Sequence, residues 1–189
     1  MKGFGAGLYL WKSGASKLSA GLEYLPTQFR PQDSDNAAMR QLDKRYSSML
    51  AFALWECSCE EWGSLRIKTA ADVLDNSGGF LVDVSYSKAV AFGPVVLTPA
   101  LGVCWTSADY NDYYYGVSTS ESKRSGLDPY EAEGGFSPFA SLRLDVALSP
   151  HWGLYAMASA MLLSEEIRES SMVNDDVKLG IGGGISYKF

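Results

Sequence analysis

The strongest constraint in this sequence is an alternation of apolar and polar residues that recurs along the whole chain. In the segment 177–189, odd positions hold Val, Leu, Ile, Gly, Ile, Tyr and Phe, and even positions hold Lys, Gly, Gly, Gly, Ser and Lys. Successive side chains of a β-strand point to opposite faces of its sheet. The segment is therefore predicted to be a strand with one apolar and one polar face.

The same alternation predicts eight further strands. They are 4–11, 17–26, 47–57, 63–74, 79–88, 95–106, 136–148 and 152–163. Most of these segments are long enough to cross a bilayer at a tilt, whereas the strands of a soluble sandwich are usually shorter. We therefore predict an all-β fold: an antiparallel, up-and-down transmembrane β-barrel with about nine or ten visible strands, in a single domain of residues 1–189.

Charged residues on the polar faces agree with a barrel, because a water-filled lumen tolerates charges that a dry core does not. Five of them are expected to point into the lumen: Arg66, Lys68, Asp83, Arg143 and Asp145. If neighbouring strands pair in order, we expect the two charges of segment 136–148 to lie within ion-pair reach of Asp83 or Lys178. A ladder of ion pairs is the expected arrangement.

The composition argues against a protein with transmembrane helices, a nucleic-acid-binding protein and a metal-binding protein. Hydrophobic residues make up 47% of the chain, yet the mean hydropathy is -0.06, and no apolar stretch is long enough for a transmembrane helix. The net charge of -6 argues against a nucleic-acid partner. Cys57, Cys59 and Cys104 lie far from His151, the single histidine. Four zinc ligands are hard to assemble from this set, so neither a metal nor a cofactor is expected.

Connection lengths predict how the barrel sits in the membrane. Short connections at 12–16, 58–62, 89–94 and 149–151 alternate with long ones at 27–46, 107–135 and 164–176; the turn 75–78 is the short exception. Outer-membrane barrels have short periplasmic turns and long extracellular loops. We therefore expect a Gram-negative outer-membrane protein whose terminal aromatics, Tyr187 and Phe189, resemble the signal that directs barrel insertion.

The strand count predicts an open seam. Nine strands cannot close an antiparallel barrel, and bacterial single-chain barrels have even strand numbers. We therefore expect that an odd number of N-terminal strands and a signal peptide are missing, with an incomplete or strained seam between Gly3–Trp11 and Val177–Phe189. The other explanation is a tenth strand in the tyrosine-rich stretch 113–117.

A loop motif adds a resemblance to a known family. Its residues are Tyr113, Tyr114, Tyr115, Gly116, Val117 and Ser118, followed by Arg124, Ser125, Gly126 and Leu127. This stretch resembles the hallmark loop of the MipA/OmpV family of outer-membrane proteins, and the pieces 9–11, 74–78 and 98–99 match as well. The tyrosines would form either a binding surface or a structural cap over the barrel mouth, and of these we favour the cap.

The resemblance implies a function that composition does not reveal. The member that this chain most resembles is described as a scaffold that links a lytic murein transglycosylase to a bifunctional penicillin-binding protein, so both enzymes and outer-membrane lipid are the expected partners. The family offers no catalytic residues to carry over. His151 lies on an expected periplasmic turn, and we expect no enzyme activity. The runner-up functions are a narrow outer-membrane pore and a surface adhesin or antigen related to stress and antibiotic response.

Overall fold

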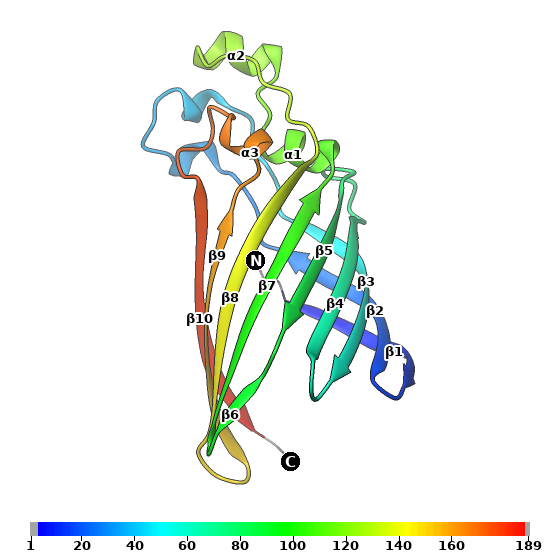
Figure 1. Cartoon of the computed structure of the whole chain (residues 1–189). Helices are drawn as coiled ribbons and strands as arrows, with labels where there is room; N and C mark the ends of the chain where they lie inside the picture. The colour runs from blue at the N-terminus through cyan, green and yellow to red at the C-terminus, as the bar shows by residue number, and fades with distance from the viewer. Residues whose placement is uncertain (1–3, 188–189) are drawn as a thin grey trace.

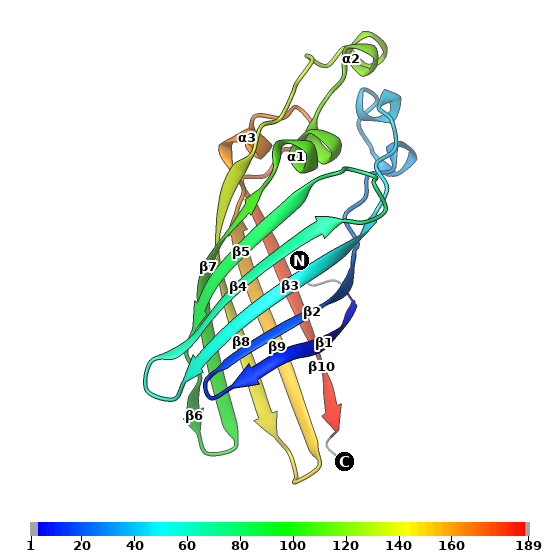
Figure 2. The same ribbon diagram turned by 90° about the vertical axis from the view of Figure 1, so that its right-hand side faces the viewer.

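A ten-stranded antiparallel sheet forms the body of the protein in the computed structural model, which describes residues 4–187. Its strands are β1 (Gly5–Ser13), β2 (Ser16–Leu25), β3 (Ser48–Cys59), β4 (Gly63–Asp72), β5 (Phe80–Ser87), β6 (Val90–Phe92), β7 (Val95–Thr106), β8 (Gly135–Ala147), β9 (Trp152–Leu162) and β10 (Val177–Tyr187). They pair in chain order, except that β5 pairs with β7 and the short β6 pairs only with β7. Figures 1 and 2 show the sheet curling around a lumen.

All helices lie in the three long connections, at one end of the sheet (Figure 1). They are the 3-10 turns η1 (Pro31–Asp33) and η2 (Met39–Gln41) and the helices α1 (Ala108–Tyr115), α2 (Thr119–Ser125) and α3 (Glu165–Arg168). We call residues 26–47, 107–134 and 163–176 together the cap. Within the described part of the chain, no helix is long and apolar enough to span a membrane.

The predicted strands are confirmed, with ends that shift by only a few residues. The additional strand β6 arises because Pro99 of β7 has no N–H to continue the ladder. Its carbonyl accepts a hydrogen bond from Lys88 N at 3.2 Å, and pairing resumes in β6 at Val90, opposite Leu97. The expectation of a tenth strand at 113–117 is wrong, because most of this stretch belongs to the helix α1.

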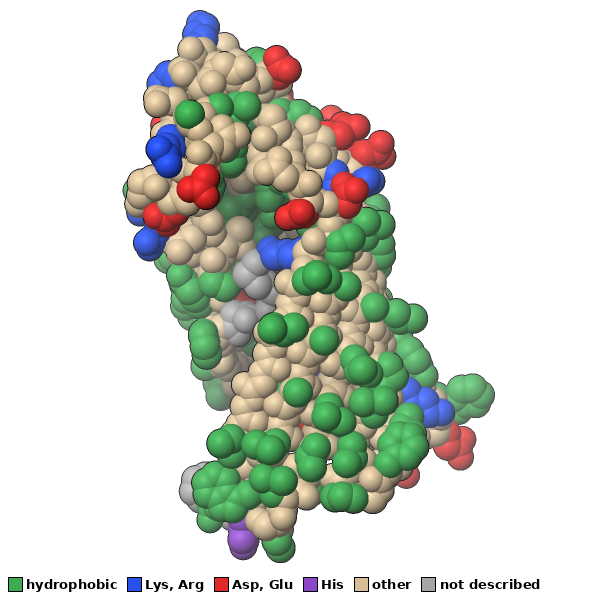
Figure 3. All heavy atoms as spheres, turned by 90° about the vertical axis from the view of Figure 1, so that its left-hand side faces the viewer, with side chains coloured by type: hydrophobic (Ala, Val, Ile, Leu, Met, Phe, Trp, Pro, Cys, Tyr) green, Lys and Arg blue, Asp and Glu red, His purple; other side chains and the backbone are tan. Residues whose placement is uncertain are grey.

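The outward face of the sheet is an apolar wall. Large hydrophobic side chains lie exposed along it, among them Leu101 at 67%, Leu179 at 75% and Ile181 at 91% exposure. Figure 3 shows hydrophobic side chains spread over the strands of one face, while most of the charged side chains in this view gather at the end that bears the cap. Soluble monomers rarely expose so much continuous apolar surface, so this wall is suited to contact with lipid.

The sheet has two free edges, β1 and β10. Nine strands lie on the path between and including these edges, each antiparallel to its neighbours, so β1 and β10 run in the same direction. Among the described residues no pairing joins the two edges, which agrees with the expected open seam. Gly3 and Phe189, which the prediction also named, lie outside the described residues.

Candidate functional site

The helix α1 is attached to the barrel wall through its N-cap residue, Ser107. Ser107 forms its N-cap: the hydroxyl accepts hydrogen bonds from Tyr110 N at 3.3 Å and from Phe80 N, at the start of β5, at 3.0 Å. Gly79 allows this close approach, because a Cβ at that position would lie 2.5 Å from Tyr110 N. The buried Asn111 accepts from the Thr106 hydroxyl at 2.8 Å and donates to the Glu133 carbonyl at 2.7 Å.

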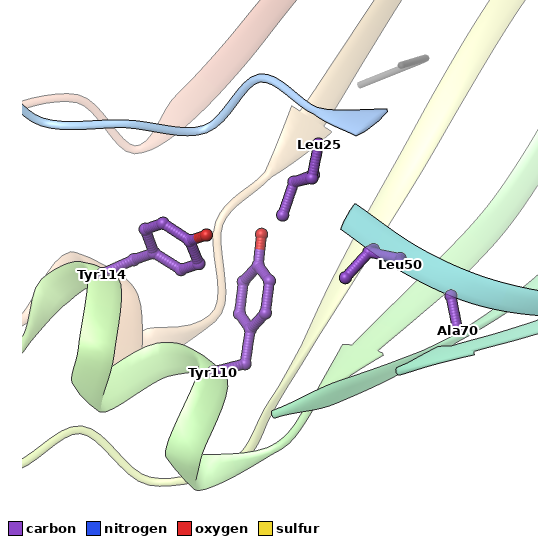
Figure 4. Close-up of a cluster of buried hydrophobic side chains, with 5 residues drawn as sticks. All are labelled: Leu25, Leu50, Ala70, Tyr110 and Tyr114. Atoms are coloured by element: carbon purple, nitrogen blue, oxygen red, sulfur yellow. The ribbon is translucent and has the colours of Figure 1, made fainter. Parts of the chain in front are cut away.

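Two tyrosines of α1 are buried between the cap and the strands β2, β3 and β4. Tyr110 and Tyr114 are 8% and 3% exposed, and their ring centroids lie 4.9 Å apart. They form one buried cluster with Leu25, Leu50 and Ala70, the core of the molecule; Figure 4 shows both rings directed from α1 toward the strands. Burial raises the pKa of both phenols, so they stay neutral at physiological pH.

Hydrogen bonds tie this tyrosine cluster to the first long connection. The Tyr114 hydroxyl donates to the Tyr46 carbonyl at 3.1 Å, and the Tyr113 hydroxyl accepts from Tyr46 N at 2.9 Å. On the other side of the cap, the Tyr115 carbonyl accepts a hydrogen bond from the Ser170 hydroxyl at 2.5 Å. The helix α1 therefore joins the first and the last of the long connections.

A buried ion pair locks the first and second long connections together. Arg45 Nη2 lies 2.8 Å from Glu121 Oε1, with side-chain exposures of 10% and 3%. Burial alone would raise the pKa of Glu121, but hydrogen bonds from Asp43 N and from the Ser118 hydroxyl and N–H, with the charge of Arg45, lower this pKa to about 2. We call Arg45, Glu121 and their partners Asp43 and Ser118 the latch.

The remaining residues of the family motif build α2 and its surroundings. Ser118 and Glu121 form a capping box at the first turn, and Gly126 ends the helix with a φ of 75°, in the left-handed region that favours glycine. Val117 is 2% exposed and forms an antiparallel bridge with Tyr130.

Four other motif residues hold the ends of this segment. The Gly116 carbonyl accepts from Arg45 at 3.1 Å, and Arg124 Nη2 lies 2.8 Å from Asp43 Oδ1. The Ser125 hydroxyl accepts from Leu127 N at 3.2 Å. Most of the motif thus makes contacts within the cap; whether it also forms an interaction surface stays a prediction.

The charges inside the lumen pair differently from the expected arrangement. Arg143 bonds Asp145 on its own strand, at 2.6 Å and 2.7 Å, and its guanidinium lies 4.5 Å from the ring centre of Tyr155. The expected pairing with Asp83 or Lys178 is wrong, because β8 pairs with β7 and β9 and not with β5 or β10. Arg143 and Asp145 lie two residues apart on the same face of β8, so each forms its ion pair within its own strand.

Other lumenal ion pairs join two of the expected five, Arg66 and Lys68, to acids that were not among them. Glu56 lies 3.6 Å from Lys17 and 3.4 Å from Arg66, and these three residues face one another in register across β2, β3 and β4. Lys68 bonds Glu23.

Asp83 is placed differently from the other lumenal acids. It lies opposite Lys68 in register, yet no cation of the described residues is within ion-pair distance of it. Glu56 was not predicted to be a lumenal residue, because apolar and polar residues alternate less regularly in segment 47–57 than in the neighbouring segments.

Aromatic rings gather at the opposite end, near the C-terminal strand. Tyr187 lies 4.8 Å from Trp152 and 5.9 Å from His151, measured between ring centroids. Phe189, the other half of the expected insertion signal, lies outside the described residues, and the role of this signal stays a prediction. Among the described residues, no group of three or more His, Cys, Asp or Glu side chains is arranged to hold a metal ion.

Comparison with known proteins identifies the family to which this chain belongs. The family described as MltA-interacting protein MipA matches residues 1–189. The outer membrane protein YiaT of Escherichia coli K12 is 39% identical over 183 residues, covering 97% of this chain and 74% of the relative. The MltA-interacting protein of the same strain is 38% identical over 188 residues, covering 100% of this chain and 75% of the relative.

More distant relatives carry similar names. The outer membrane protein OmpV of Vibrio cholerae is 25% identical over 158 residues, covering 84% of this chain and 60% of the relative. No solved structure matches the chain. Since the family match spans every residue and two relatives share more than a third of their aligned residues with it, the chain belongs to the MltA-interacting protein (MipA) family of outer-membrane proteins.

Proposed function

We propose that this protein is a non-catalytic scaffold, which holds a lytic murein transglycosylase close to a bifunctional penicillin-binding protein at the outer membrane. The family and the name of the relative in Escherichia coli support the first partner, and the resemblance of the loop motif supports both. The observation that carries the proposal is the burial of Tyr110 and Tyr114 between α1 and the strands β2, β3 and β4 at the cap end of the barrel. Rings packed at this end leave less room for solutes, so the barrel is better suited to anchoring partners than to conducting solutes, the runner-up function.

The cap end faces outward in this proposal, and the short turns face the periplasm, where both enzymes act. The short-turn end exposes three large aromatic side chains: Trp62 at 74%, Phe92 at 62% and Trp152 at 52%. Aromatic residues are frequent binding hot spots. A stable complex buries about 1,200 Å² or more, so a partner must contact several of these turns together.

Binding, and not catalysis, is the proposed activity. The relatives are named as outer-membrane or interacting proteins. His151, the single histidine, lies exposed on the turn between β8 and β9, against the ring of Tyr187 and outside the cap. A general base must lie within hydrogen-bond reach of the proton that it abstracts, and His151 lies on a turn that is exposed to solvent.

The proposal is tested by photo-crosslinking in living cells. A photoreactive phenylalanine analogue replaces Trp62 or Phe92 at the turns, and Lys123, an exposed residue of α2, in the control. We expect adducts with the transglycosylase from the turn positions and not from Lys123. Adducts from Lys123 alone would show that the cap end, and not the short turns, faces the periplasm. The absence of adducts from every turn would contradict the scaffold function.

We also propose that further strands close the barrel between β1 and β10, within one barrel domain. The two edges run in the same direction, so an odd number of antiparallel strands is needed. Unpaired backbone groups in lipid cost several kcal/mol each, and both relatives named from Escherichia coli are longer than this chain.

Cysteine pairing tests this closure in a variant of the full-length protein whose native cysteines are replaced by serine. We expect no disulfide between a cysteine at Leu8 and cysteines at Leu179, Ile181 or Ile185. The control pair at Ala158 and Ile181, which are register partners in β9 and β10, should form one. A disulfide from Leu8 to any position of β10 would show that the two edges pair directly.

A further inference from the structure

A pocket of about 340 Å³ lies where the outer wall of the barrel meets the cap. Its lower part is formed by outward-facing side chains of β8 and β9: Phe136, Pro138 and Leu162. Phe136 and Leu162 are 66% and 44% exposed, and both belong to the apolar wall. This part of the pocket is therefore suited to a hydrocarbon chain.

The upper part of the pocket is polar and is formed by the start of the connection between β9 and β10. Glu165, Glu166 and Arg168 of α3 line it together with Ser164. Ser164 is 5% exposed, and its hydroxyl oxygen is buried without a hydrogen-bond partner in the part of the chain that the structure describes. Because this oxygen has almost no accessible surface, the polar groups that are open to a ligand are the side chains of α3.

The backbone of α3 is held in place by the rest of the cap. The Tyr130 hydroxyl donates to the Glu166 carbonyl at 2.7 Å, and Arg168 Nε donates to the Leu163 carbonyl at 3.1 Å. The guanidinium of Arg168 lies 3.8 Å from Asp176, a long contact that leaves most of its donors available. The polar groups are therefore positioned before any ligand arrives.

Gly135 allows the polar and apolar parts of the pocket to approach each other closely. A Cβ at this position would lie 2.6 Å from both Cβ and Oγ of Ser164, a distance that real side chains do not adopt. Ser164 therefore packs directly on the backbone of β8, which places α3 next to Phe136 and Pro138 at the edge of the pocket.

We propose that this pocket binds a sugar-bearing lipid of the outer leaflet, with an acyl chain against Phe136 and the sugar beneath α3. The two carboxylates accept hydrogen bonds from sugar hydroxyls, while Arg168 donates to sugar or phosphate oxygens. A phospholipid headgroup without a sugar would offer the carboxylates of Glu165 and Glu166 a phosphate in place of hydroxyl donors, and they would repel it. The occupant is thus a glycolipid of the lipopolysaccharide type, and the inference rests on the proposed orientation with the cap outside.

Photo-crosslinking of the full-length protein in vesicles tests the site. A photoreactive phenylalanine analogue replaces Phe136, or Phe80 on the neighbouring wall as a control for general lipid contact. One set of vesicles contains purified lipopolysaccharide, and the other contains only phosphatidylethanolamine and phosphatidylglycerol. The test variant is Glu165→Gln with Glu166→Gln, and its charge-matched control is Glu169→Gln with Asp175→Asn.

We expect a lipopolysaccharide adduct at Phe136 that falls about fivefold in the test variant, the loss expected when hydrogen bonds of ordinary strength are weakened. The charge-matched control and the adduct at Phe80 should not change. An adduct at Phe136 that is insensitive to Glu165 and Glu166, or one that forms equally with phospholipid, would overturn the glycolipid site. The absence of lipid adducts from both Phe136 and Phe80 would instead contradict the membrane placement of the wall.

Discussion

Substitution of Glu121 by glutamine should open the cap while the barrel stays intact. The change keeps the shape of the side chain but removes the charge that pairs with Arg45, whose side chain is only 10% exposed. Breaking a buried pair by removing one partner costs roughly 3–5 kcal/mol. The lowered pKa of Glu121 agrees in direction, because it shows that the folded cap favours the charged carboxylate.

Hydrogen exchange of the protein in lipid nanodiscs measures this opening. The N–H groups of Asp43 and Ser118 donate directly to the Glu121 carboxylate, so peptides that cover them report the latch. A loss of about 3 kcal/mol in local stability speeds exchange by roughly a hundredfold. The matched control is Glu131→Gln, an exposed glutamate in the same connection. Unchanged exchange at Asp43 and Ser118, or equal acceleration in β8, would refute the reasoning.

The latch also predicts a dependence on pH. Because the pKa of Glu121 is lower in the folded cap, its stabilisation is fully present above its ordinary value of 4.5 and is lost as the pH falls toward 2. Exchange in the cap should therefore rise as the pH falls through this window, after correction for intrinsic rates. The Glu121→Gln variant should show no such rise, and a similar rise in that variant would assign the effect to another group.

Two further predictions concern the mouth and the topology. Replacing Tyr110 and Tyr114 by alanine should give larger single-channel currents in planar bilayers than the unaltered protein gives, because both rings occupy space at the cap end of the barrel; equal currents would show that the passage is closed elsewhere. Single cysteines at Arg124 and Glu169 should react with an impermeant thiol reagent on intact cells, and a cysteine at His151 should react only after the outer membrane is permeabilised. Labelling of intact cells only at position 151 would show that the short turns, and not the cap, face outward.

The strands were predictable from the sequence because each one carries its own signal, the alternation that places one face in lipid and the other in the lumen. The helices of the cap were not predicted, since their stability depends on distant contacts such as Arg45 with Glu121, 76 positions apart. One local signal was available: Ser118 followed by Glu121 is the pattern of a capping box. The pair of Arg143 with Asp145 could also have been predicted, because residues two apart in a strand share a face.

The way the cap is built has a consequence for the order of assembly. Tyr110 and Tyr114 follow β7, yet they pack against Leu25 and Leu50, which belong to β2 and β3. These contacts join distant parts of the chain, and such contacts form late because a long loop must first be closed. The latch can therefore close only after the strands from β2 to β7 have come together. A probe of the contact between Arg45 and Glu121 would report in real time when this half of the barrel wall has been completed during insertion.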